Sequence, residues 1–255
     1  MKVKELYKYL DSRIPKTLSC AWDNDGLMCC PEPEREVRRV LLCLDVSDGA
    51  VDKAVNGGFD VIVSHHPIIF KGLRSVSGET GAAGKLIKLI KSGISVMSFH
   101  TRFDALEGGV NDVLARILGL ENVEKIENDG IELGRVGELS RDTELEKFAS
   151  TVKEKLSAPF VSVGKCGDKV RRVAVVGGSG GDFVHSAVSK GADTLVSGVI
   201  GYHTMTEARD IGMNLIEAGH YYTENPSLSA LSDIVLEADG SIYTEIIPSN
   251  TIFEI

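Results

Sequence analysis

The sequence lacks several features that would place the protein in a special class. It has no uninterrupted apolar run long enough to cross a bilayer, and its first 18 residues form an amphipathic pattern broken at Pro15 instead of an apolar leader. Its five cysteines form no C-x-x-C pair, and their odd number argues against a disulfide framework. We therefore expect a cytoplasmic protein without a membrane span.

Positive charge is also scarce. The chain has 28 Lys and Arg against 37 Asp and Glu, a formal net charge of −9. Proteins that bind nucleic acid or anionic lipid through their overall charge need an excess of basic residues. We therefore expect neither nucleic acid nor a membrane as partner, although a local basic patch is compatible with this balance.

What the chain does contain is an internal repeat. The segment Val37–Val40 recurs as Val170–Val173, and the same offset of 133 residues aligns further identities up to Val63 and Val196. Each copy reads as a buried strand, a helix that ends at a glycine and a second strand, a pattern that favours parallel sheets. We predict an internally duplicated α/β protein. Two similar units, residues 1–125 and 126–255, would have mostly parallel sheets and pack around a local dyad.

Three clusters of metal-ligand residue types follow predicted strands. They are the pair His65–His66 and two segments in which a carboxylate comes four residues after a histidine, His100 with Asp104 and His220 with Glu224. Ligands in parallel α/β sheets gather at the carboxyl ends of strands. Imidazole and carboxylate ligands together suit Zn, Fe, Mn, Co or Ni. The sequence thus predicts a metal site between the two units.

Each cluster alone has a plainer interpretation. A vicinal histidine pair is more often structural, and a histidine four residues before an acid is common by chance. The metal hypothesis depends on finding all three clusters at strand ends, two of them at equivalent points of the repeat. His185 lies inside a predicted helix, residues 182–190, and is interpreted as a surface residue. For His203, in a loop after a strand, a role at the site and a solvated position both stay open.

Weaker motifs accompany these clusters. The glycine-rich segment Gly177–Gly181 follows a strand, and a tight turn is favoured over a phosphate cradle because the glycine spacing fits no phosphate-binding motif. Asp45 is interpreted either as a helix cap or as a group that orients a ligand histidine. The segment Trp22–Leu27 is interpreted as a packed turn in preference to a pocket wall.

Six separated motifs, in this order, resemble the Nif-three-like family, whose members are often labelled GTP cyclohydrolase 1 type 2 homologues. The resemblance runs from about residue 20 to the C-terminus and is to the short form, without an inserted middle domain. The motifs are Trp22-Asp-Asn-x-Gly-Leu27, Leu44-Asp-Val-Ser47, Ser64-His-His-Pro-Ile-Ile-Phe70, His100-Thr-x-x-Asp104, Gly177-Gly-Ser-Gly180 and Gly219-His-Tyr-x-x-Glu224.

The resemblance implies two divalent metal ions per subunit and a ring-shaped homohexamer. Carried over position by position, it makes five residues the metal ligands and leaves His100 as a neighbour that either ligates or supports a ligand. The five are His65, His66, Asp104, His220 and Glu224.

A centre of this kind would supply a hydroxide nucleophile near neutral pH. Hydrolysis of a small nucleotide-like substrate follows as the expected reaction, including opening of a guanine ring with release of formate. His100 or His203 would transfer protons and Arg102 would pair with a substrate phosphate. A phosphoester hydrolase and a non-enzymatic metal-binding or protein-interaction ring remain as alternatives. The chain departs from the family at Arg102, where relatives usually have Asn, and at Val199, where many have an acid; both positions bear on the substrate.

Overall fold

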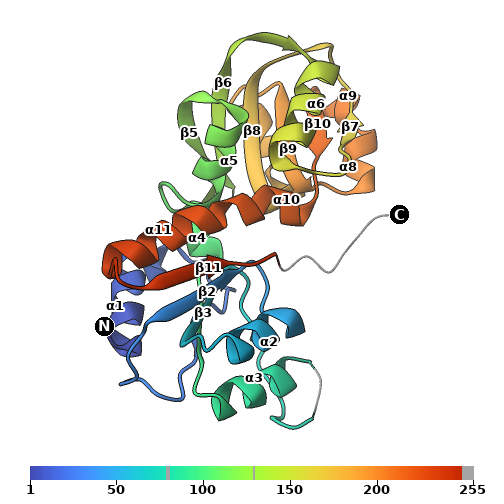
Figure 1. The fold of residues 1–255 in the computed structure, drawn as a ribbon. Coiled ribbons are helices and arrows are strands. Elements are labelled where there is room, and N and C mark those ends of the chain that lie inside the picture. Colours follow the sequence, from blue (N-terminus) through green and yellow to red (C-terminus); the bar gives the residue numbers. More distant parts are fainter. Residues whose placement is uncertain (79–80, 129, 249–255) are drawn as a thin grey trace. The chain divides into compact units, whose positions relative to one another are not determined.

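The chain folds into two compact α/β units. The computed structural model describes residues 1–78, 81–128 and 130–248. One unit combines residues 1–106 with residues 228–248, and the other comprises residues 107–227 (Figure 1). The α/β prediction is confirmed. The sequence repeat suggests a boundary between the units at residue 125. In the structure, the first unit ends at Leu106, and the segment from Leu228 packs with the first unit and not with the second.

The first unit is built on a five-stranded sheet of order β1-β4-β3-β2-β11. Strands β2 (Arg39–Cys43), β3 (Val61–Ser64) and β4 (Ser95–Ser98) are mutually parallel, and β11 (Tyr243–Ile246) adds to β2 in parallel. Only β1 (Gly26–Cys29) is antiparallel, to β4. Strands β3 and β4 are buried at every position, as expected for central strands covered on both faces.

Helices cover both faces of this sheet. On one face, α2 (Asp48–Asn56) and α3 (Gly81–Lys91) pack on a core that includes Leu41, Ile62 and Val96. On the other, α1 (Val3–Arg13) contacts α11 (Leu228–Ala238), which lies on β2 (Figure 1). The predicted break at Pro15 is confirmed, because α1 ends before it and a short 3-10 helix, η1 (Lys16–Leu18), follows.

The second unit has a six-stranded sheet of order β5-β6-β8-β9-β10-β7. Its centre is again parallel, formed by β8 (Lys169–Ser179), β9 (Thr194–Val199) and β10 (Asn214–Glu217). The flanking strands are antiparallel: β5 (Glu121–Asn128) and β6 (Ile131–Glu144) on one side and β7 (Ser162–Gly164) on the other.

Alternate residues of β8 face the two cores of this unit, as the pleat of a strand requires. Val173 and Val175 point to helices α5 (Val110–Leu118) and α6 (Leu145–Leu156). Ala174 and Val176 point to the other core, built with the 3-10 helix η2 (Gly181–Phe183), α7 (Val184–Ser189) and α9 (Ala208–Ile211). Glu207 separates α9 from the short helix before it, α8 (Tyr202–Thr206).

The two parallel cores share their hydrogen-bond register. Asp60 accepts bonds from the amides of residues 38 and 39, and Asp193 accepts the same bonds from residues 171 and 172, at an offset of 133. The strand pairs are Val40 with Val61 and Val173 with Thr194. Duplication of one unit into the other, and a dyad between them, remain predictions.

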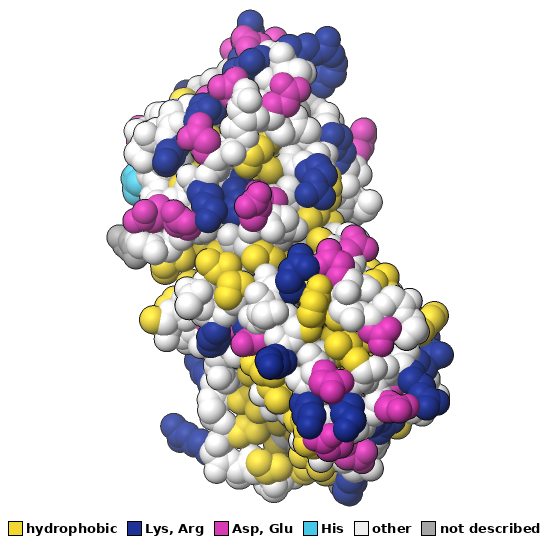
Figure 2. Space-filling view, turned by 90° about the vertical axis from the view of Figure 1, so that its left-hand side faces the viewer, with side chains coloured by type: hydrophobic (Ala, Val, Ile, Leu, Met, Phe, Trp, Pro, Cys, Tyr) yellow, Lys and Arg dark blue, Asp and Glu magenta, His cyan; other side chains and the backbone are white. Residues whose placement is uncertain are grey.

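The surface carries charge of both signs. On the face drawn in Figure 2, Lys and Arg side chains lie among Asp and Glu side chains and form no continuous basic stripe of the kind that follows a nucleic-acid backbone. Among the described helices, none combines the length and apolarity that crossing a bilayer needs.

Candidate metal centre

Three histidines meet at one edge of the first unit's sheet. His65 and His66 directly follow β3, and His100 stands two residues after β4. Because β3 and β4 are parallel neighbours, their carboxyl ends lie at the same edge. One ring nitrogen from each histidine can be chosen so that the three atoms lie within 4.8 Å of one another, which is close enough to share a metal ion. The first unit thus contains a group of residues that could hold a metal.

All three imidazoles are oriented by oxygen acceptors. In each ring Nδ1 is bonded to an oxygen, which leaves Nε2 as the candidate ligand atom. The pairs are His65 with the Phe99 carbonyl at 3.0 Å, His66 with Asp45 Oδ1 at 2.8 Å and His100 with Asp23 Oδ1 at 2.9 Å. Metal-binding histidines usually show this arrangement, because the second bond fixes both ring orientation and tautomer.

Of the two roles considered for Asp45, the structure shows the orienting one: its carboxylate holds the ring of His66, whose role as a metal ligand stays a prediction. Asp45 follows β2, the third strand of the parallel set, and therefore reaches the same edge as His66. The capping role belongs to Ser47, whose hydroxyl accepts a bond from the Ala50 amide at the start of α2.

A carboxylate joins the histidines through a one-turn helix. His100 is the N-cap of α4 (Thr101–Ala105), so Asp104 lies one turn later on the same face. Asp104 is buried, and its Oδ1 atom lies 3.6 Å from Nε2 of His65. The spacing between His100 and Asp104 is therefore helical, and it directs the carboxylate towards the histidine group.

The turn before β1 supports His100, a role that the sequence analysis missed. Asp23 also accepts bonds from the Thr101 amide and hydroxyl, at 3.1 and 2.6 Å. Burial acts to raise the pKa of Asp23, but the bonds from His100 and Thr101 outweigh it and hold the pKa at about 2. Asp23 is therefore ionised at neutral pH and accepts the Nδ1 proton of His100. The packed-turn interpretation fits Asp23, but it is wrong for Trp22, whose side chain is 60% exposed.

Arg102 has a structural position, contrary to expectation. Its side chain is fully buried, with Nε 3.1 Å from Asp25 and Nη1 2.7 Å from Asp11 and 2.8 Å from the Ile14 carbonyl. The guanidinium thus joins α4 to the C-terminal end of α1 and to Asp25, the residue before β1. The expectation that Arg102 pairs with a substrate phosphate is wrong, because the whole side chain is shielded from solvent and its Nε and Nη1 atoms donate to protein oxygens.

The second unit offers a histidine and a carboxylate on a similar one-turn helix. His220 and Glu224 begin and end α10, which follows β10, and His220 Nε2 lies 3.0 Å from Glu224 Oε2. Glu224 is buried whereas His220 is partly exposed.

Glycines of this unit make room for that pair. A Cβ atom added to Gly178 would overlap Oε1 of Glu224 and approach Cε1 of His220 to 3.2 Å, and one on Gly198 would lie 2.7 Å from the His220 Cα. The amides of the glycine segment are bonded within the protein: Gly177 to the Asn111 side chain, Gly178 to Thr223 and Gly180 to the Val199 carbonyl. These three amides are therefore occupied by protein acceptors, which agrees with the tight-turn interpretation.

A sequence profile of the Duf34/NIF3 family (NGG1p interacting factor 3) matches residues 1–252. The chain belongs to this family. A relative from Clostridium acetobutylicum, named GTP cyclohydrolase 1 type 2 homolog, is 34% identical, covering 91% of this chain and 88% of its own. A relative of the same name from Clostridium perfringens is 30% identical, and the alignment covers 93% of this chain and 92% of the relative. The alignment to a Staphylococcus aureus relative extends over 342 positions, more than the 255 residues here, as expected if this is the short form.

Solved structures agree with this membership. The crystal structure of Staphylococcus aureus hypothetical protein SA1388 is 30% identical with a TM-score of 0.91, covering 100% of this chain and 99% of that one. Reduced HcgD from Methanocaldococcus jannaschii is 28% identical with a TM-score of 0.83, covering 96% and 97%. The Nif-three-like resemblance is thus confirmed.

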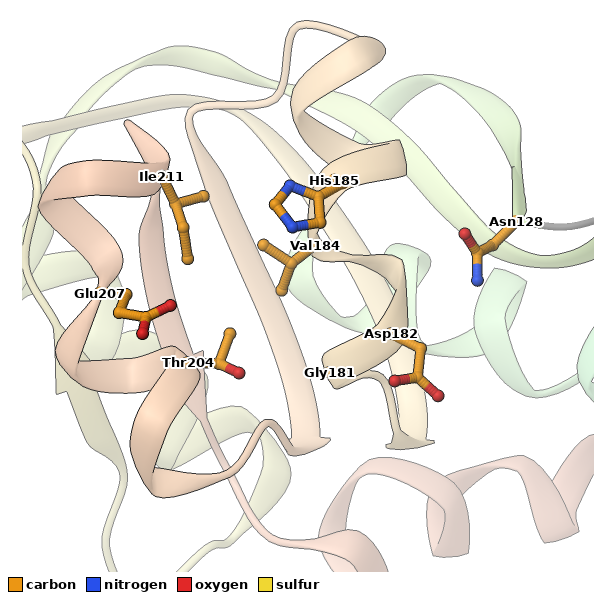
Figure 3. A pocket seen from close by; sticks show the side chains of 8 residues that line it. All are labelled: Asn128, Gly181, Asp182, Val184, His185, Thr204, Glu207 and Ile211. Carbon is orange, nitrogen blue, oxygen red and sulfur yellow. The ribbon is translucent and has the colours of Figure 1, made fainter.

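The other two histidines of this Duf34/NIF3 chain are exposed. His185 is on α7, as predicted, and lines a hollow of about 420 Å³ whose opposite wall carries Thr204, Glu207 and Ile211 (Figure 3). The lining contains none of the predicted metal ligands. His203 is on α8, with its ring 5.7 Å from that of Tyr202. Its role in proton transfer stays a prediction, as does the union of the two units' ligands in one centre.

Proposed function

We propose that this Duf34/NIF3 protein is a metal-dependent hydrolase of a nucleotide-like substrate. Two divalent ions would be held by five residues from both units, with His100 beside them. The ligands would be His65, His66 and Asp104 from the first unit and His220 and Glu224 from the second. The observation that carries the proposal is the group of three histidines, each oriented through Nδ1 by an oxygen acceptor.

The donor set fits a catalytic metal better than a structural one. Structural zinc sites are typically closed and rich in thiolate, whereas the groups here combine imidazole with carboxylate and include no cysteine among the described residues. These ligands suit Zn, Fe, Mn, Co or Ni. When bound, such ions supply Lewis acidity and an activated water for hydrolysis.

His100 is the best-placed residue for proton transfer. The Asp23 carboxylate accepts its Nδ1 proton, so Nε2 is the basic nitrogen that can take up or return a proton if it is not itself a ligand. His203 is a second candidate, from an exposed helix of the other unit. In the ring-opening reaction, one water adds to the carbon between the two nitrogens of the guanine imidazole and one carbon–nitrogen bond breaks to give a formamide. A second water then hydrolyses the formamide, which releases formate and leaves the amine. The names of the curated relatives support this choice of substrate.

The first test is metal content. We expect purified protein to bind a divalent ion, measured by elemental mass spectrometry, and His65→Ala and Glu224→Ala to lose most of it. His185→Ala, an exposed histidine outside the predicted ligand set, is the matched control and should bind as the wild type does. If the two ligand variants retain wild-type metal content, the proposed centre is wrong.

The second test is activity. Metal-loaded protein is assayed for formate release from GTP and for cleavage of a panel of phosphoesters. Formate release that is lost in His65→Ala supports the cyclohydrolase reaction. Cleavage of phosphoesters alone would replace that reaction with the phosphoester hydrolase. Full metal occupancy with no turnover would favour a non-enzymatic metal-binding or protein-interaction ring.

We also propose a cytoplasmic homohexamer. All five cysteines are free, as in a reducing compartment. Light scattering should give six times the chain mass of 27.4 kDa, and a monomer would contradict the ring.

A further inference from the structure

The only tryptophan of the chain is exposed but firmly held. Trp22 has 60% of its surface accessible, an unusual position for so large an aromatic side chain. The two residues after it anchor the turn: Asp23 is bonded to His100 and Thr101, and the Asn24 side chain donates to the Ile69 carbonyl. Trp22 is therefore placed by its neighbours and not by burial of its own ring.

The ring of Phe70 lies beside that of Trp22 and is also exposed. Its side chain is 47% exposed, and its ring centroid lies 6.2 Å from that of Trp22 at an interplanar angle of 73°. Both rings also contact His100 edge to face, Trp22 at 6.3 Å and Phe70 at 6.0 Å. Trp22 and Phe70 thus form an aromatic corner over the imidazole of His100, which itself belongs to the histidine group that could hold a metal.

We propose that this aromatic corner, Trp22 with Phe70, binds a planar heteroaromatic ring of the substrate, such as a nucleobase, beside the histidine group. The proposal rests on the proposed function for the reaction that follows binding. Bases stack on exposed aromatic faces in many nucleic-acid-binding proteins, with little dependence on which base is bound. Because both side chains are largely exposed, each ring offers accessible surface for such a contact.

Charge beside the corner favours a nucleotide over a neutral aromatic compound. Lys71 directly follows Phe70, and Arg74 comes three residues later. Both side chains are exposed, and neither has an ion pair within residues 1–78, 81–128 and 130–248. These two cations, which follow Phe70 in the chain and are exposed, would be available to a phosphate carried by the bound ring.

The single tryptophan provides a direct assay. Wild-type protein, treated with EDTA to prevent turnover, is titrated with GMP or with ribose 5-phosphate while tryptophan emission is recorded. We expect GMP to quench the emission in a saturable manner and ribose 5-phosphate to leave it unchanged. No quenching by GMP, or an equal change with both compounds, overturns the proposal.

Variants of the corner separate stacking from other effects. We expect Phe70→Leu and Trp22→Leu each to weaken GMP binding about tenfold or more. Binding to Phe70→Leu is measured by quenching of tryptophan emission, and binding to Trp22→Leu, which has no tryptophan, by calorimetry. Phe70→Tyr and Trp22→Phe keep an aromatic ring and should retain most of the affinity for GMP. If Trp22→Leu lowers the oligomer mass and leaves GMP binding unchanged, the corner is a subunit contact and the proposal fails.

The proposed function can fail independently. His65→Ala should retain GMP quenching, because stacking does not require the metal ligand. Quenching with no hydrolysis by metal-loaded wild-type protein would sustain the aromatic corner and reject the hydrolase. Hydrolysis of GTP with unchanged KM in Trp22→Leu would sustain the hydrolase and reject the corner.

Discussion

Gly178→Ala tests whether the glycine segment exists to admit a ligand carboxylate. Gly178 has φ of +64°, in the left-handed region, so any L-residue there costs about 1–2 kcal/mol. The added Cβ would also overlap Oε1 of Glu224 and lie 3.1 Å from its Cδ. Because a carboxylate at the end of a flexible side chain can rotate away, the overlap should displace Glu224 and leave the fold intact.

Gly212→Ala is the matched control. Gly212 belongs to the same unit and has φ of +81°, yet an added Cβ would meet nothing within 4 Å. Without metal, we expect both variants to lose about 1–2 kcal/mol of unfolding free energy, measured by urea denaturation. Only Gly178→Ala should then lose metal affinity, by about 10- to 100-fold, measured by calorimetric titration.

Two results would refute this reasoning. Wild-type metal affinity in Gly178→Ala would mean that Glu224 is not displaced or is not a ligand. A much larger loss of stability in Gly178→Ala than in Gly212→Ala would mean that the overlap is relieved by the backbone and not by the carboxylate.

Three further predictions concern the first unit. Asp45→Ala should weaken metal binding by about 10- to 100-fold in calorimetric titration, because His66 loses the acceptor that orients it, whereas Asp48→Ala, at an exposed position of α2, should not. Arg102→Met should lower the unfolding free energy by about 3–5 kcal/mol in urea denaturation, because it removes the buried guanidinium from Asp25 and leaves that buried carboxylate with only the half-exposed Lys16 as a cation, and the exposed Arg38→Met should change it little. Cys43 should resist iodoacetamide in the folded protein from neutral to mildly alkaline pH and react once urea is added, as followed by mass spectrometry, because burial raises the pKa of its thiol.

Each has a result that contradicts it. An unchanged metal affinity in Asp45→Ala would remove the orienting role of that carboxylate. Equal stability of the two arginine variants would mean that the buried ion pair is replaced without loss by methionine packing. Rapid alkylation of folded Cys43 would show that the first unit opens locally under native conditions.

The parallel centre of each unit and the histidine edge were predictable because their signals are local. The apolar runs around Val61 and Val196 are continuous, and in each case a serine and then a histidine or a glycine follows. Once the strands are taken as parallel, placing their ends at one edge needs no further knowledge. The helical spacing of His100 and Asp104 likewise explains why a four-residue interval brings a carboxylate to the site.

The remaining parts depend on contacts between residues distant in sequence. Strand β5 buries only Ile126 and therefore lacks the alternating pattern that marks a strand. The buried position of Arg102 depends on Asp11 and Asp25, which reach it from two other segments, and arginine is rarely fully buried. The support that Asp23 provides to His100 spans 77 residues, and the sequence contains no pattern that links them.

Strand β11 has a consequence for the order in which the protein is made. It pairs with β2 across about 200 residues of chain, and α11 before it packs on α1. During synthesis from the N-terminus, the first unit therefore lacks an edge strand and a covering helix until residues 228–246 have followed residues 107–227 out of the ribosome. His65, His66 and His100 appear early in translation, but the unit that holds them is complete only when the chain is nearly finished.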